Sequence, residues 1–247
     1  MKRLLLDLVV GPGWKDYSYK SDAIRTQKNN VLAVWRNQKD ATFGIERLVR
    51  LSLAVTAFAF PALYIRHFSG KTGMLRRKLA IEVYVVAKLL LPLIGLIFGI
   101  DKFSLFAVLV GYMALETILY NLSLLFLSDI FVEPISFKRS YISALVNLFE
   151  IIFDFAVLYK AVGVIDGART ALDAIYFSSV TAFTIGYGDM KPLSDFGKVL
   201  VITHATFSLV LVALVLARLV SALDTNNVRK QMAGKSSQDD RERAIAS

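Results

Sequence analysis

The sequence Thr184-Ile185-Gly186-Tyr187-Gly188-Asp189 is the most informative stretch of the chain. It lies in a comparatively polar region, 164–197, between two long apolar segments. A chain that enters a bilayer without forming a helix needs another use for its backbone carbonyls. Glycines at alternate positions tolerate positive φ, so successive carbonyls can face one axis and replace the hydration shell of a cation. The Thr184 hydroxyl would add a further oxygen.

Composition places this motif in a membrane protein. Of 247 residues, 55% are hydrophobic, the mean hydropathy is +0.54, and the apolar residues are gathered into long runs. Such runs exclude an ordinary soluble protein. The net charge of +9 would suggest nucleic acid in a soluble chain, but membrane proteins keep Lys and Arg in cytoplasmic loops, so no nucleic-acid partner is expected. The absence of cysteine excludes disulfides and thiolate chemistry.

The apolar runs predict an all-α membrane protein of four parts. Five segments approach the roughly 20 residues that a bilayer requires: about 46–66, 79–100, 103–128, 141–163 and 198–223. We therefore expect a basic N-terminal segment, a group of N-terminal membrane helices, a helix–loop–helix region around the motif, and a polar tail. Their bounds are 1–45, 46–140, 141–223 and 224–247.

Charge predicts which side of the membrane each loop occupies. The linker 66–78 carries five basic residues and no acid, which indicates the cytoplasm, and both basic termini are expected there as well. These five are Arg66, Lys71, Arg76, Arg77 and Lys78. Segment 46–66 then has cytoplasmic flanks on both sides and cannot cross once. Its early Arg47 and Arg50 and its Pro61 favour an interfacial or re-entrant helix, leaving four crossings. The alternative is a fifth crossing with the N-terminus outside.

The motif and its surroundings resemble the pore of potassium channels, whose filters read T-V/I-G-Y-G. An outer helix (141–163), a pore helix (about 170–182), the filter and an inner helix (198–223) follow the family's order, so the resemblance covers about a third of the chain. It implies a homotetramer, because one loop cannot surround an ion path. It also implies no enzymatic activity, no cofactor, and K+ as the permeant ion.

The same resemblance assigns roles to the filter and its supports. Four residues are expected to bind K+ through backbone oxygens: Thr184, Ile185, Gly186 and Tyr187. Gly188 lets the chain leave the filter, and the Tyr187 ring is expected to pack behind it. Three further residues are expected to support the filter: Asp189, which matches the acid after the family motif, Thr181, which fills the first position of T-x-x-T-x-G-Y-G, and Tyr176.

Tyr176 and Phe177 stand where the family often has tryptophans, and only Tyr176 can donate a hydrogen bond. Ser208 occupies the place of the glycine hinge that many of these channels have in the inner helix. The spacing of Ser208, Val212 and Leu216 predicts a row facing the central cavity, with Val220 near the cytoplasmic constriction. The alternative is that these residues form only one packed face of the helix.

Ionisable residues within membrane segments invite a functional interpretation. They are Glu82, Lys88, Glu116, Glu150 and Asp154. Pairing is favoured, Lys88 with Glu116 and either Glu150 or Asp154 with a neighbouring base, over a proton path or a metal site. His204 is expected to form a hydrogen bond behind the pore helix rather than to act as a pH-sensitive group.

The sequence thus predicts a potassium-selective channel that conducts passively in the cell membrane. The alternatives are a subunit of a potassium uptake system and a non-conducting regulatory membrane protein. No usual voltage sensor is expected, because such a sensor has an arginine at every third position of a membrane helix. Here only Arg47 and Arg50 follow that spacing, and the next position is Leu53. Membrane lipids are expected partners, and the N-terminal segment could bind an unidentified regulator.

Overall fold

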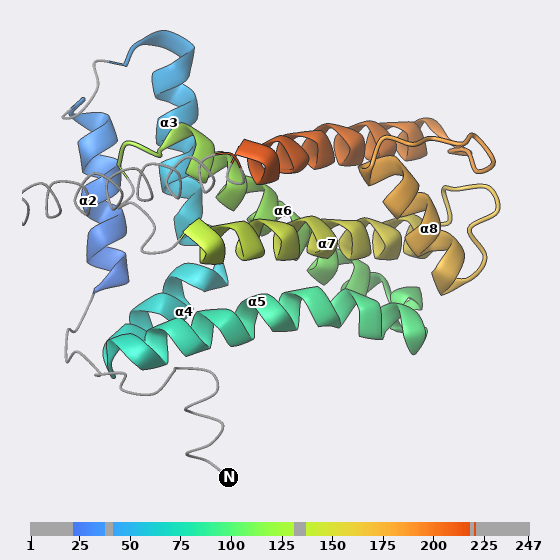
Figure 1. The fold of residues 1–247 in the computed structure, drawn as a ribbon, viewed down its shortest axis with the longest axis horizontal. Coiled ribbons are helices and arrows are strands. Elements are labelled where there is room, and N and C mark those ends of the chain that lie inside the picture. Colours follow the sequence, from blue (N-terminus) through green and yellow to red (C-terminus); the bar gives the residue numbers. More distant parts are fainter. Residues whose placement is uncertain (1–21, 38–41, 131–136, 218–219, 221–247) are drawn as a thin grey trace, which may run out of the picture. The chain divides into compact units, whose positions relative to one another are not determined.

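The computed structural model describes residues 22–37, 42–130, 137–217 and 220. All regular elements within these ranges are helices, which confirms the predicted all-α class (Figure 1). The α-helices are α2 (Ala23–Trp35), α3 (Gly44–Thr56), α4 (Pro61–Gly70), α5 (Met74–Ile97), α6 (Ser104–Phe126), α7 (Phe137–Val162) and α8 (Ala171–Ala182), with 3₁₀ turns η1 (Ala57–Ala59) and η2 (Ile100–Lys102). A last helix, Asp195–Ala217, is called the inner helix below. The expected tail 224–247 lies outside the described residues.

Four helices among the described residues are long and apolar enough to cross a membrane. They are Leu75–Ile97, Ser104–Phe126, Tyr141–Val162 and Asp195–Ala217, each of 22 or 23 residues. These match four of the predicted segments, with the inner helix beginning three residues earlier than expected. At 1.5 Å per residue, each is long enough to cross the hydrocarbon core of about 30 Å. The protein is therefore a multi-pass membrane protein.

The remaining predicted segment, 46–66, is a broken helix. It forms α3 with η1, and then α4, and the two parts meet at an angle of 64°. Phe60 is extended, with φ −108° and ψ 145°, and Pro61 is the first residue of α4. A proline restricts the residue before it to extended backbone and suits the first position of a helix, so Pro61 explains the break. The pair would make a fifth span only if it crossed as one bent element.

The described residues fall into two compact units, divided within α5 after Lys88 and within α6 after Ile118. The first unit comprises α2, α3, α4, the start of α5 and the end of α6. Its core contains Val34 from α2, Leu53 and Ala54 from α3, and Leu127 beyond α6. Packing of these apolar side chains orders α2 and α3, which are too short to be stable alone.

Two buried polar contacts fix α3 within the first unit. The Gln27 amide nitrogen donates to the Ala54 carbonyl at 2.7 Å. Ala54 is in the last turn of α3, where carbonyls lack helical partners, so Gln27 satisfies one of them. The buried Arg50 guanidinium donates to the Asp129 carboxylate at 2.6 Å. A buried charge needs such a partner, and this pair joins α3 to the segment after α6.

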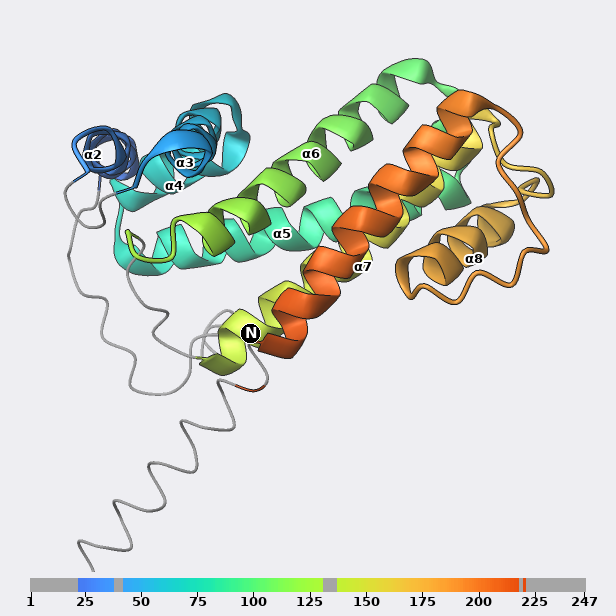
Figure 2. The same ribbon diagram turned by 90° about the horizontal axis from the view of Figure 1, so that it is seen from above.

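The second unit contains the rest of α5 and α6, with α7, α8 and the inner helix. A cluster of Leu96, Val110, Ala156, Val157 and Ala174 joins α5, α6, α7 and α8. In Figure 2 the inner helix, coloured orange, runs along α7, with α8 beside them. Helices α5, α6, α7 and α8 therefore share one apolar core, and α8 directly precedes the motif.

Polar contacts also bind α7 to the two helices before it. Lys160 on α7 forms an ion pair of 2.6 Å with the buried Asp101 of η2. The Thr117 hydroxyl of α6 donates to the Glu150 carboxylate at 2.6 Å. Glu150 and Asp154 are both buried, as expected of acids that point into a helix bundle rather than into lipid. The pairing of Lys88 with Glu116 stays a prediction.

Gly95 allows α5 to approach the start of α6 closely. A Cβ added at Gly95 would lie 2.2 Å from Cζ of Phe106, far inside van der Waals contact. Gly111 on α6 differs, because its added Cβ would meet Leu158 Cδ2 at an ordinary 3.6 Å. Both glycines lie in helices, where alanine is otherwise preferred by up to about 1 kcal/mol.

We therefore predict opposite outcomes for two alanine substitutions. Gly95→Ala should destabilise the protein by about 1–3 kcal/mol, because the Phe106 ring must move out of its packed position. Gly111→Ala should leave stability unchanged or raise it slightly. Thermal unfolding in detergent measures both, and Phe106→Leu should partly restore the stability of Gly95→Ala. Equal unfolding temperatures for the two alanine variants would contradict the close approach.

Candidate functional site

The motif begins directly after α8, whose N-terminus is fixed by a capping box. The Thr170 hydroxyl accepts the backbone N–H of Asp173 at 3.1 Å, and the Asp173 carboxylate accepts the backbone N–H of Thr170 at 2.8 Å. These bonds satisfy two N–H groups that a helix start leaves open. The backbone N–H of Thr170 is also the main reason that the pKa of Asp173 lies below its usual value. The capping box thereby fixes the residue at which α8 begins.

Buried contacts hold α8 against α7. The Ser178 hydroxyl donates to the Ile152 carbonyl of α7 at 2.6 Å. The Phe177 ring of α8 meets the Tyr159 ring of α7 edge to face, with centroids 5.1 Å apart. These contacts set the position of α8, and therefore the point from which the loop departs.

His204 on the inner helix completes this support. Its Nδ1 lies 3.0 Å from the Tyr159 hydroxyl, and its ring stacks on Phe155 at 4.2 Å. The hydrogen bond expected of His204 is therefore made to Tyr159, a residue that the sequence analysis did not single out. His204 and Tyr159 are both fully buried. One aromatic cluster thus connects α7, α8 and the inner helix behind the loop.

The backbone of the motif alternates in sign. Positive φ occurs at Thr184 (56°), Gly186 (57°) and Gly188 (78°), and not at Ile185 or Tyr187 between them. An added Cβ at Gly186 or Gly188 would meet no atom within 4 Å, so glycine is needed there for conformation rather than for space. Positive φ at a β-branched residue such as Thr184 is strained. Such alternation can turn successive carbonyl oxygens toward one side of the chain.

The start of the motif is tied to the last turn of α8. The backbone N–H groups of Ile185 and Gly186 both donate to the Val180 carbonyl, at 2.9 and 3.4 Å, and that of Thr184 donates to the Thr181 carbonyl at 3.1 Å. These bonds use carbonyls that a helix end leaves open. The Thr181 hydroxyl donates back to the Phe177 carbonyl at 2.8 Å. Thr181 therefore meets the motif through its carbonyl rather than through its hydroxyl.

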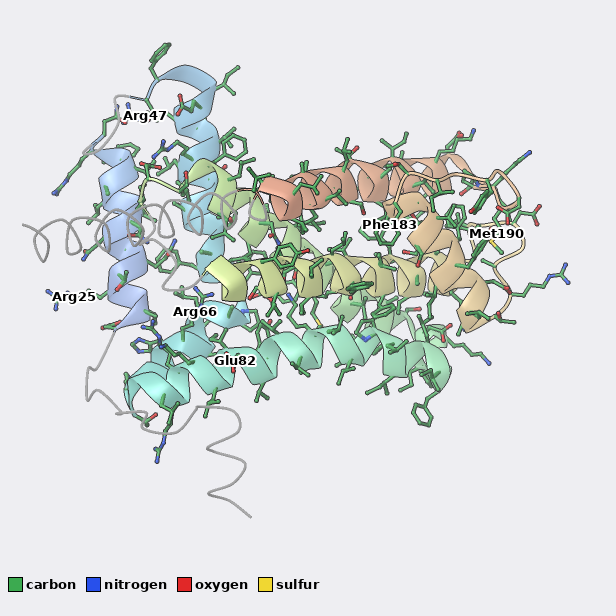
Figure 3. The ribbon with its side chains drawn as sticks, in the orientation of Figure 1. Arg25, Arg47, Arg66, Glu82, Phe183 and Met190 are labelled. Atoms are coloured by element: carbon green, nitrogen blue, oxygen red, sulfur yellow. The ribbon has the colours of Figure 1, made fainter. Side chains whose placement is uncertain are left out.

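A side-chain bond holds the end of the motif. The Tyr176 hydroxyl donates to the Asp189 carboxylate at 2.8 Å, and this bond is the main reason that the pKa of Tyr176 is raised. This bond joins α8 to the residue that follows Gly188. Both ends of the motif are therefore hydrogen-bonded to α8. Figure 3 labels Phe183, which caps α8, and Met190, which follows the motif.

The returning chain is anchored to the segment before α8. The backbone N–H of Leu193 donates to the Val164 carbonyl and that of Asp166 to the Lys191 carbonyl, each at 2.8 Å. Gly197 lets the inner helix begin against this segment, since an added Cβ would lie 3.1 Å from the Val164 carbonyl oxygen. The chain that follows the motif is therefore held against the chain that precedes α8.

On a single chain the motif is exposed. Residues 183–189 are all exposed, including Ile185 at 51% and Tyr187 at 68%. The Tyr187 ring, which was expected to pack behind the motif, has no such cover among the described residues. Exposed apolar and aromatic side chains in a membrane protein suit contact with lipid or with another protein chain.

The inner helix departs from one expectation. Ser208 was expected to face an open cavity, but it is completely buried, on the same helix face as His204, Leu211 and Val215. Its hydroxyl has no hydrogen-bond partner among the described residues. Packing within the chain therefore uses the position that the spacing assigned to the cavity. Val212 is partly buried, whereas Leu216 and Val220 are more than half exposed, so their cavity roles stay predictions.

Backbone oxygens are the cation ligands that the loop offers. Within the ranges that the structure describes, no group of three or more His, Cys, Asp or Glu could hold a metal ion. The carbonyls at 184–188 and the Thr184 hydroxyl are hard oxygen ligands, which suit an alkali cation better than a transition metal.

Comparison with known proteins finds a family match for the region around the motif. Residues 145–225 match the family described as "Ion channel". A two pore potassium channel b of Oryza sativa subsp. japonica is 52% identical over 44 residues, which cover 17% of this chain and only 13% of that relative. No solved structure matches the chain significantly.

The family match covers α7 from residue 145, α8, the motif and the inner helix. It therefore covers every element that holds the loop in place. An ion channel is a membrane transport protein rather than an enzyme, in agreement with the sequence analysis. The region 145–225, with the TIGYGD motif at its centre, therefore matches the ion channel family and is similar in part to a potassium channel.

Proposed function

We propose that the protein is a potassium-selective channel that conducts K+ passively. The observation that carries this proposal is the alternation of positive φ at Thr184, Gly186 and Gly188 within the sequence TIGYGD. Carbonyl oxygens turned to one side can replace the water around K+ as it enters. In this account the ion sites are formed by the backbone oxygens of four residues, with the Thr184 hydroxyl: Thr184, Ile185, Gly186 and Tyr187.

The supports around the loop would keep these oxygens at a constant separation. Tyr176 and Asp189 hold the outer end of the filter, and the Val180 and Thr181 carbonyls hold its inner end. The C-terminal end of α8 also carries the negative end of the helix dipole, which favours a cation nearby. No covalent chemistry is needed, because the ion moves down its electrochemical gradient.

A single loop cannot enclose an ion path, so we propose a homotetramer around one axis. The exposed Ile185 and Tyr187 on the isolated chain support this proposal. The inner helix supports it too, because Ile202, Leu209 and Leu216 are all more than half exposed. Neighbouring copies would cover part of these surfaces, and lipid would cover the remainder.

Gating by an arginine-rich voltage sensor is not part of this proposal. Arg50 is buried and paired with Asp129, and Arg47 donates to the Trp35 carbonyl at 3.0 Å. Both side chains thus make contacts that hold α3 against its own neighbours. Steep voltage gating needs several charges that move through the membrane field, each supplying about 2.3 kcal/mol per 100 mV.

Gly186→Ala should abolish selective K+ flux. A Cβ at φ 57° costs about 1–2 kcal/mol, so the backbone should leave the conformation that aligns the carbonyls. The measurement is K+ against Na+ flux in liposomes. Gly44→Ala is a matched control, because Gly44 also has positive φ (61°) and open space but lies at the start of α3. Selective flux through a folded Gly186→Ala protein would contradict the assignment.

The assembly prediction is a complex of four chains. Native mass spectrometry of the detergent-solubilised protein should give four times the chain mass of 27.5 kDa, or about 110 kDa, plus bound lipid. A conducting species of one or two chains would contradict the proposal.

A further inference from the structure

Helix α3 has apolar side chains on two opposite faces. Its inner face contributes Leu53 and Ala54 to the core of the first unit. Its outer face carries Ile45, Leu48 and Val55, which are 81%, 68% and 49% exposed, and Phe43 before the helix is 84% exposed. The spacing of three and seven residues places Ile45, Leu48 and Val55 in one stripe. We call Phe43, Ile45, Leu48 and Val55 the outer stripe.

The helix that packs beside α3 exposes several basic residues. Helix α2 contacts α3 through the Gln27 bond to Ala54, and it contacts α4 through the Asp22 carboxylate, which lies 3.0 Å from Nδ1 of His67. Its basic residues Arg25, Lys28 and Arg36 are exposed. Figure 3 shows Arg25 projecting away from α2. Leu32 and Trp35 near its end are exposed as well, so α2 has the mixed surface of a helix at the level of lipid headgroups.

This neighbour excludes a crossing by α3 and α4. Because α2 is packed against both helices, a bent pair that crossed the bilayer would take α2 into the hydrocarbon with it. A basic residue at the centre of a membrane helix costs about 2.5–3.5 kcal/mol, and α2 would bring in several. Helix α2 has 13 residues and is about 20 Å long. If it entered the bilayer beside α3, its two ends could not both stay at one membrane surface.

The charge of the first unit fits an anionic surface. The described residues of the first unit include eleven Lys or Arg and four Asp or Glu. Near the stripe, the Arg47 guanidinium lies over the Trp35 ring at 5.6 Å, and Trp35 is 59% exposed. Tryptophan and arginine together suit the boundary between acyl chains and headgroups. Each basic residue near an anionic leaflet adds about 1 kcal/mol of attraction.

We propose that α3 lies in the membrane plane on an anionic leaflet, with the outer stripe among the acyl chains and Arg36 and Arg47 among the headgroups. Helices α2, α3 and α4 of the first unit then form a lipid-binding element at the membrane surface, and α3 with α4 is not a fifth span. This proposal does not depend on ion selectivity, since it rests on the first unit alone. A second copy of the chain is the competing occupant of the stripe, and the experiment separates the two.

The test measures the depth of single tryptophans in the full-length protein. Trp14 and Trp35 are the two native tryptophans. In a Trp14→Phe, Trp35→Phe background, Leu48→Trp and Val55→Trp place probes on the stripe, and Asn29→Trp places a control on exposed α2. The protein is reconstituted in vesicles whose lipids are brominated at known acyl positions, and circular dichroism confirms that helix content is unchanged.

We expect the brominated lipids to quench tryptophan fluorescence strongly at positions 48 and 55 and little at position 29. The quenching should place positions 48 and 55 at equal depth. If α3 crossed the membrane, the two stripe positions would differ in depth by about 10 Å, because seven residues separate them. That result would overturn the proposal. Weak quenching at both stripe positions would overturn it as well, because it would mean that protein or water, and not lipid, covers the stripe.

A second arm tests lipid charge. In equal mixtures of phosphatidylglycerol and phosphatidylcholine, brominated phosphatidylglycerol should quench Leu48→Trp at least about twofold more than brominated phosphatidylcholine. Arg36→Gln with Arg47→Gln should bring this ratio close to one. Lys198→Gln, an exposed cation in the second unit, should leave it unchanged. A ratio of one before any charge is removed would overturn the anionic preference.

Discussion

The hydrogen bonds from the motif to the end of α8 are the constraint on which the pore region depends. In a membrane, a helix satisfies its own backbone, whereas an irregular loop cannot. Residues 184–186 solve this by donating their N–H groups to the carbonyls of Val180 and Thr181. The motif thereby closes the open end of α8 and leaves its own carbonyls available. Such carbonyls are the main ligands of the proposed ion sites.

The surrounding elements keep α8 from moving. The capping box at Thr170 fixes its start, Ser178 bonds it to α7, and Phe177 rests on Tyr159, which in turn bonds His204 of the inner helix. A shift of the inner helix would therefore act on the loop through His204 and Tyr159. Hydrogen bonds from residues 184–186 to the end of α8, and from Tyr176 to Asp189, hold the backbone on either side of the strained φ of Thr184.

Local patterns in the sequence predicted much of this structure. Apolar run lengths located four spans, and glycine spacing with the threonines located the loop and its short preceding helix. Long-range contacts were beyond such reasoning, because no local pattern marks the Tyr159–His204 bond or the pair of Arg50 with Asp129. Ser208 shows the same limit. Its spacing suited a cavity, but which face of a helix packs inward depends on the neighbouring helix.

The central claim is potassium selectivity, and the unmodified protein tests it most directly. In a planar bilayer with K+ on one side and an equal concentration of Na+ on the other, selective carbonyl sites predict a current that reverses far from zero, at a voltage set by the ratio of the K+ and Na+ permeabilities. Exchanging the two solutions should reverse its sign. A conducting protein whose current reverses near zero under both arrangements would contradict the account.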